Sequence, residues 1–195
     1  DRVSESDLRT VRLKYALPEE FILAVGHFER RKNYLRLIDA MARLRDRGRS
    51  CALLIVGNDS GLGKTIQERI ESAHLSGCVK VLSDLSDLEV RCVYTLCSLF
   101  VFPSSYEGFG IPILEAMAAK RPMVLSDLPV FREITQDRGV YFPHDNVELM
   151  VLAIESVLSS SSERARLVEY GNERVQAFSF QSLAAQVERL YRSLI

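Results

Sequence analysis

The sequence predicts an α/β fold, a doubly wound, Rossmann-like parallel sheet of about six strands, and three observations lead to this prediction. Short apolar, β-branched runs alternate with amphipathic runs along the chain, which is the order of strands and helices in a parallel α/β domain. Several short runs are apolar on both faces, as strands are when helices cover both sides of a sheet. Of the 195 residues 47% are hydrophobic, which is enough for a sizeable core.

The elements of the N-terminal half follow in order. The first strand is FILAV, and apolar residues then recur at helical spacing over 34–44, with Asn33 as the expected N-cap and Gly48 as the stop. The second strand, CALLIV, leads into a glycine-rich turn, and the third is VKVL. SDLE at 86–89 is a capping box that opens the next helix. The six expected strands are 21–25, 51–56, 79–82, 99–102, 122–125 and 139–142.

Beyond the last strand the sequence predicts only helices, over about 147–158, 162–178 and 180–194. Residues 1–195 therefore form one predicted domain, with C-terminal helices over about 147–194. In such a sheet ligands bind at the carboxyl ends of the strands. The loops that follow strands are thus where a functional site is expected.

Composition excludes several classes of function. A net charge of −1 and a pI near 6.4 leave no global basic field for nucleic acid or an anionic membrane surface. Four scattered cysteines lack the paired short spacing of zinc ligands, and we expect reduced thiols in a cytoplasmic protein. No apolar stretch approaches the roughly 18 residues of a membrane span. The polar start without Met indicates a piece of a longer protein. The cysteines are Cys51, Cys78, Cys92 and Cys97.

The stretch IVGNDSGLGKT at 55–65 resembles a phosphate-binding P-loop, but its first glycine is one residue out of position. A P-loop needs glycine, four residues and then Gly-Lys-Ser/Thr. Counting back from Gly63, the first position is Asn58, and Gly57 comes one residue too early. We interpret the stretch as a turn into a solvated helix, with Lys64 facing water. The P-loop stays open as the alternative.

A better candidate for an anion site follows the fourth strand, in FPSSYEGFGIPILEAMA. Pro112 favours the first turn of a helix, so the free backbone amides before it should cluster at a helix N-terminus. Glu115 lies one turn into that helix and leans back toward the same place. Glu107 and Glu115 would repel a phosphate, so we expect them to bind neutral sugar hydroxyls. The amides are those of Gly108, Phe109, Gly110 and Ile111.

These motifs resemble the nucleotide-sugar site of retaining glycosyltransferases of the GT-B fold, family 4, the glycosyl transferases group 1. The two glutamates with seven residues between them are the most specific match. AVGHFERRKNYLRLIDA, LLIVGNDSG, LSDLPVFREI and FSFQSLAAQVERLYRSL resemble further segments of that family. The resemblance covers nearly the whole chain. It implies the C-terminal, donor-binding half of a GT-B fold, with the N-terminal acceptor domain absent from this chain.

The resemblance also implies roles for individual residues. Glu107 would lie beside the donor sugar and assist at the transition state, Arg31 and Lys32 would neutralise the diphosphate, and Glu115 would bind the ribose diol. The alternative is that Arg31 and Lys32 are solvated charges at a helix start and Glu115 a surface acid. No metal or other cofactor is implied. The remaining nucleotide-sugar contacts would be Gly26, His27, Leu82, Ser83, Gly108, Phe109, Gly110 and Ile111, with the backbone of Leu82 and Ser83 facing the base.

Three positions depart from the family pattern. His27 stands where many members carry arginine, and Arg30 occupies a position that is often proline, where it could replace the lost charge. Lys120 follows the helix at a place where glycine is common, so a strained φ is expected there.

We therefore expect the donor-binding domain of a retaining, metal-independent glycosyltransferase. It would act with its missing N-terminal domain and move a sugar from a nucleotide sugar to a saccharide or lipid-linked acceptor, so this chain alone is expected to be inactive. The ERRKN loop favours a mannosyl- or rhamnosyl-type enzyme of bacterial surface-polysaccharide assembly that uses GDP-mannose or a similar donor. A GT-B nucleotide-sugar hydrolase or epimerase stays open, as does a catalytically silent nucleotide-binding domain, although the latter would not need both glutamates.

Overall fold

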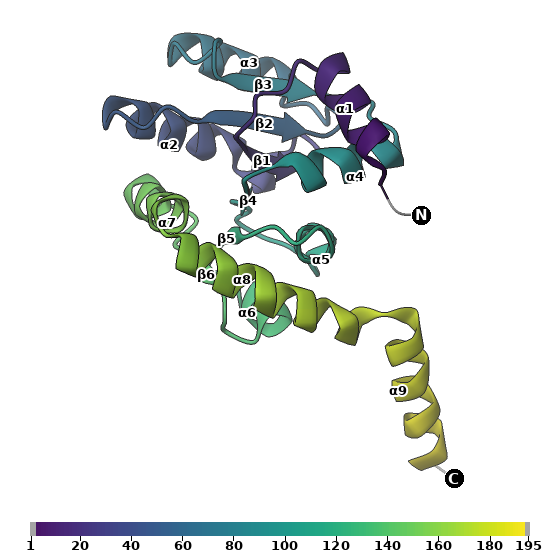
Figure 1. The fold of residues 1–195 in the computed structure, drawn as a ribbon. Coiled ribbons are helices and arrows are strands. Elements are labelled where there is room, and N and C mark those ends of the chain that lie inside the picture. The colour runs from purple at the N-terminus through teal and green to yellow at the C-terminus, as the bar shows by residue number, and fades with distance from the viewer. Residues whose placement is uncertain (1–2, 194–195) are drawn as a thin grey trace.

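The computed structural model describes residues 3–193, except for the side chains of residues 180, 183, 185, 186 and 193. Its six strands form one parallel sheet in the order β3-β2-β1-β4-β5-β6 (Figure 1). This confirms the predicted fold class, and each strand begins and ends within one residue of its predicted position. The strands are β1 Phe21–Val25, β2 Ala52–Val56, β3 Val79–Leu82, β4 Leu99–Phe102, β5 Met123–Ser126 and β6 Val140–Phe142.

The strand order reverses between β1 and β4. The chain runs outward from β1 to β3, crosses back to pair β4 with β1, and then runs outward on the other side to β6. Such a reversal leaves a crevice at the carboxyl ends of the two central strands. The loops after β1 and β4, which are far apart in the sequence, are therefore neighbours in space.

Helices cover both faces of the sheet and bury two apolar layers. One layer joins the sheet to α2, α3 and α7, and the other joins it to α1, α4, α5 and α6. Ile22 and Ala24 face the first layer, whereas Phe21 and Leu23 face the second, which is why the strands are apolar on both faces. The helices are α1 Glu5–Lys14, α2 Tyr34–Asp46, α3 Gly63–Ser72, α4 Asp87–Leu96, α5 Ile111–Ala118, α6 Pro129–Thr135, α7 Val147–Ser159, α8 Ser161–Arg174 and α9 Phe180–Ser193.

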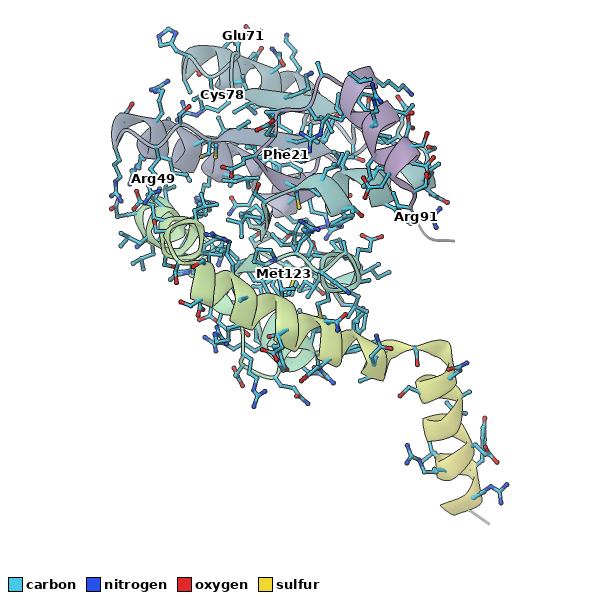
Figure 2. All side chains as sticks on the ribbon, in the orientation of Figure 1. Phe21, Arg49, Glu71, Cys78, Arg91 and Met123 are labelled. Carbon is cyan, nitrogen blue, oxygen red and sulfur yellow. The ribbon has the colours of Figure 1, made fainter. Side chains whose placement is uncertain are left out.

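Polar and apolar side chains are segregated accordingly. Phe21 and Met123 lie within the body of the molecule, whereas Glu71 and Arg91 lie at its outline (Figure 2).

Among the described residues, no helix combines the length and the apolar character needed to cross a membrane. All four cysteines are free thiols, and burial raises the pKa of Cys51 to about 11 and that of Cys97 to about 12.

The predicted helix boundaries hold in part. The capping box between Ser86 and Glu89 is present, and Gly48 takes a φ of +78° just after α2, as expected of a glycine beyond a helix C-cap. Asn33 takes the expected N-cap position of α2, in a left-handed conformation, but its side chain makes no cap hydrogen bond. Its Nδ2 donates to the carbonyls of Pro103 and His144, and its Oδ1 accepts from Arg36 Nη1.

Two short helices, α1 and α6, were not predicted. α1 begins with a capping box between Ser4 and Asp7, but Val11 is its one fully buried residue, so its apolar periodicity is weak. The predicted helix over 162–178 ends at Arg174 and continues as a 3-10 turn over Val175–Phe178.

α9 extends away from the sheet (Figure 1). Val187 and Leu190 of its predicted apolar stripe are exposed in this chain. The rest of that stripe, Phe180, Leu183 and Leu194, lies outside the described side chains.

Candidate functional site

The loops after β1, β4 and β6 are tied together at the carboxyl edge of the sheet. The backbone amide of Ser105 donates to the carbonyl of Arg31 over 2.8 Å. The Asn33 amide donates to the carbonyls of Pro103 and His144 over 3.0 and 2.7 Å. Asn33 is buried with a φ of +60°, a conformation that asparagine tolerates better than most residues. The three loops therefore form one surface.

The predicted residues Arg31, Lys32 and Glu107 meet on this surface. Arg31 Nη1 lies 2.6 Å from Glu107 Oε2, and Lys32 Nζ lies 2.7 Å from Glu107 Oε1. The Glu107 and Lys32 side chains are only 9% and 7% exposed, whereas Arg31 is 37% exposed. The alternative of two solvated charges is therefore wrong for Lys32. Arg31 also pairs with Glu29 over 2.7 Å, so the cluster consists of two cations and two carboxylates.

Gly26 explains how Lys32 can lie so deep. Its φ is +145°, and a Cβ there would lie 2.9 Å from Lys32 Cε and 3.0 Å from Nζ, closer than side chains pack. Lys32 Nζ also lies 5.0 Å from the ring centroid of Phe102, within the range of a cation–π contact. A side chain at position 26 would push Lys32 away from Glu107.

Electrostatics keep the Glu107 carboxylate ionised. Burial alone raises the pKa of Glu107, but hydrogen bonds from Lys32 and Ser104 and the charges of Lys32 and Arg31 outweigh burial, so this pKa lies below its usual range. For Arg31, burial opposes the charge, yet Glu107 and Glu29 hold its pKa above the ordinary value. Glu107 and Arg31 are therefore both charged at neutral pH.

The helix start after Glu107 has the predicted form. Gly110 is the N-cap with a φ of +115°, and Pro112 lies in the first turn of α5. Within residues 3–193, no hydrogen bond is made by the backbone amides of Gly108, Phe109, Gly110 and Ile111. Phe109 and Ile111 are exposed. These amides lie at the positive end of the α5 dipole and are free to bind an anion.

Glu115 lies one turn into α5, apart from the charged cluster. It is exposed, and its Oε2 accepts a hydrogen bond of 2.9 Å from the hydroxyl of Tyr94. Burial, followed by the charge of Glu115, raises the pKa of Tyr94, so the phenol stays a donor. Glu115 lines a groove of about 880 Å³ between α4 and α5. Lys120 lines the same groove and takes the expected left-handed conformation, with a φ of +56°.

The other predicted nucleotide contacts are at this edge of the sheet but differ in availability. The Leu82 carbonyl, expected to face the base, already accepts a 3.0 Å hydrogen bond from the Gly57 amide. Ser83 is exposed directly after β3. His27 and Arg30 are exposed on the loop after β1, and within the described chain neither side chain has a hydrogen-bond or ion-pair partner.

The glycine-rich stretch after β2 has no phosphate-binding geometry. Asp59 Oδ1 accepts hydrogen bonds of 2.8–2.9 Å from three successive glycine-loop amides, those of Gly61, Leu62 and Gly63. These donors are therefore taken, and the Asp59 carboxylate would repel a phosphate. The Lys64 side chain is 90% exposed beside Glu68, as predicted for a turn into a solvated helix.

Ser104 and Ser126 are site residues that the sequence did not single out. Ser104 Oγ donates to Glu107 Oε1 over 2.8 Å, and Ser126 Oγ lies 2.5 Å from the Ser104 carbonyl oxygen. Both serines are 0% exposed. Small polar residues at or near the ends of two buried strands were the available signal. Across residues 3–193, no cluster of three or more His, Cys, Asp or Glu side chains is placed to hold a metal ion.

The known proteins that this chain resembles include glycosyltransferases from several bacteria. The family model described as "Glycosyl transferases group 1" matches residues 11–174. The O-antigen chain mannosyltransferase B of Escherichia coli is 28% identical over 193 residues, which cover 98% of this chain and 51% of that protein. The chain thus spans about half the length of this curated relative.

Two solved structures share the fold. The C-terminal domain of a glycosyl transferase group 1 family protein (LpcC) from Francisella tularensis superimposes with a TM-score of 0.75 at 18% identity, covering 89% of this chain and 93% of that domain. Anabaena Alr3699/HepE in complex with UDP and glucose gives a TM-score of 0.84 at 20% identity, covering 97% of this chain and 53% of that protein.

Proposed function

Because this chain belongs to the glycosyl transferases group 1, we propose that it is the donor-binding domain of a retaining, metal-independent glycosyltransferase. The observation that carries the proposal is the Glu107 carboxylate held between Arg31 and Lys32, in the loop that ends at the unpaired amides of α5. This arrangement offers a cation pair, a carboxylate and a helix N-terminus at one edge of the sheet. A nucleoside diphosphate sugar needs partners of all three kinds.

The diphosphate would be bound by Arg31, Lys32 and the amides of residues 108–111. As the bond to the sugar breaks, negative charge develops on the leaving diphosphate, and fixed cations and aligned amides stabilise it without reorganisation. Lys32 is anchored by burial against Phe102 and Gly26, so little conformational entropy remains to be lost on binding. These donors can take the place of a metal ion at the departing phosphate.

Glu107 would interact with the donor sugar rather than with the diphosphate. An ionised carboxylate only accepts hydrogen bonds, so it can bind sugar hydroxyl groups. It can also stabilise the positive charge that develops on the sugar ring in the transition state. Its low pKa, maintained by Lys32 and Ser104 against the effect of burial, keeps it in this form.

Glu115 would bind the ribose. The Tyr94 hydroxyl occupies Oε2, which leaves Oε1 to accept from the vicinal hydroxyls of a nucleoside. The absence of side chains at Gly108 and Gly110 lets a ligand approach the backbone closely. The base would then lie toward the exposed loop after β3, at Leu82 and Ser83.

The donor and its partners follow from the relatives. The similarity to a mannosyltransferase supports GDP-mannose or a similar donor, and a saccharide or lipid-linked acceptor. Because the chain spans about half of that relative, we assign the acceptor site to an N-terminal domain outside this chain. The free thiols of Cys51 and Cys78 fit a cytoplasmic location, where thiols stay reduced.

Amide chemical-shift mapping tests the location of this site. Titrating the ¹⁵N-labelled chain with GDP or UDP should shift the amides of residues 26–31, 82–83 and 108–111, because these loops surround the proposed nucleotide. Residues 61–65 should stay unchanged, and guanosine without phosphates should leave 108–111 unchanged. Shifts confined to 61–65, or none with any nucleoside diphosphate, would show that the site is assigned to the wrong loops.

A further inference from the structure

We propose that Ser104 is a positioning residue, whose hydroxyl fixes the orientation of the Glu107 carboxylate between Arg31 and Lys32. The proposal rests on the proposed function only in making Glu107 the residue that faces the donor sugar. The structural part of the proposal, a hydroxyl that orients a buried carboxylate, is independent of any ligand.

The hydroxyl of Ser104 has one evident use. Ser104 is completely buried, so water cannot take its hydrogen bond, and a buried hydroxyl without a partner is costly. Its Oγ lies 2.8 Å from Glu107 Oε1. Because an ionised carboxylate accepts and does not donate, the serine must be the donor. The bond therefore favours the ionised form of Glu107 in one rotamer.

Ser104 is itself held in place. Ser126, equally buried at the end of β5, lies with its Oγ 2.5 Å from the Ser104 carbonyl and 3.0 Å from the Phe102 carbonyl. Asn33 fixes the neighbouring carbonyl of Pro103. The backbone on both sides of Ser104 is thus tied to the sheet. This places the positioning hydroxyl on a rigid support, as precise orientation requires.

The cations alone would hold Glu107 less well. Oε2 is bound by Arg31, which is more than a third exposed and is shared with Glu29 at 2.7 Å. Oε1 is bound by both Lys32 and Ser104. The buried phenol of Tyr34 lies near enough that the charge of Glu107, after burial, raises its pKa. Without Ser104, Lys32 is the single rigid donor, and the carboxylate can follow the motion of Arg31.

Replacing Ser104 by alanine should have two measurable effects. Carbon-detected NMR titration of the Glu107 carboxyl should show its pKa rising toward the ordinary glutamate value, because one hydrogen bond to the charged form is lost. The affinity for the sugar-bearing donor should fall about three- to tenfold, as for one lost hydrogen bond. The affinity for the bare nucleoside diphosphate should stay nearly unchanged. Ser104→Thr keeps a hydroxyl and should restore the pKa of Glu107.

A matched control removes a hydroxyl elsewhere. Ser156 Oγ donates to the Ala153 carbonyl within α7, so Ser156→Ala should alter neither the Glu107 pKa nor either affinity. An unchanged Glu107 pKa in Ser104→Ala, or equal weakening of both ligands, would overturn the positioning role. If the unmodified chain bound no nucleoside diphosphate, the proposed function would fail, whereas the titration of Glu107 would still decide the role of Ser104.

Discussion

Replacing Lys32 by methionine should weaken the binding of a nucleoside diphosphate by about 1–3 kcal/mol, the cost of losing a charge-assisted hydrogen bond. This corresponds to roughly five- to 150-fold in the dissociation constant. Methionine keeps an unbranched apolar stem for packing against Phe102, so the change removes the charge and little volume. Titration calorimetry with GDP and UDP measures the effect. Because the Lys32 hydrogen bond is the main influence that lowers the pKa of Glu107, the variant should also raise that pKa.

The matched control is Lys64→Met. Lys64 is highly exposed and lies 3.7 Å from Glu68, so its loss should leave nucleotide affinity almost unchanged. The opposite ranking of the two variants would move the phosphate site to the glycine-rich loop after β2. That result would contradict the geometry in which Asp59 occupies the amides of this loop.

Glu115→Ala should weaken the binding of a ribonucleoside diphosphate by about 1–3 kcal/mol, the range for hydrogen bonds to a charged group. A 2′,3′-dideoxy analogue should bind the chain and its variant almost equally, because it lacks the hydroxyls that Glu115 is proposed to accept. The two ligands and two proteins form a thermodynamic cycle that isolates this contact. Competition binding with all four combinations provides the measurement.

Glu169→Ala is the control for this cycle, since Glu169 is an exposed acid on α8, outside the candidate site. It should change neither affinity. Equal losses for the ribonucleotide and its dideoxy analogue in Glu115→Ala would mean that Glu115 acts through the structure of α5 or through general charge. The ribose assignment would then be wrong.

Much of the fold could be predicted because its signals are local. Phe21 to Val25 and the other short apolar runs give strands without reference to the rest of the chain. The reversal of strand order places the loops after β1 and β4 together. Two segments that are far apart in the sequence, and that each resemble the family, therefore lie side by side in the fold. Gly110 and Pro112 indicated the helix start in the same local way.

The details of the site depend on tertiary contacts. Glu107 lies 75 and 76 positions from its two cations, and no local pattern shows that Lys32 is buried or that Gly26 makes room for it. Asn33 is the N-cap that the sequence predicted, but its side chain makes no cap bond and instead joins loops 70 and 111 positions away. Tertiary contacts, and not the local sequence, decide the partners of that side chain. Helix α1 was missed because a largely polar helix buries too little to show a period.

Calorimetric titration of the chain with GDP and UDP, first in EDTA and then with excess magnesium, tests the central claim most directly. If Arg31, Lys32 and the α5 amides hold the diphosphate, binding should occur in EDTA and change little when magnesium is added. Binding that appears only with magnesium, or a strong preference for ATP over both diphosphates, would contradict a diphosphate site built from the cations and amides of this chain.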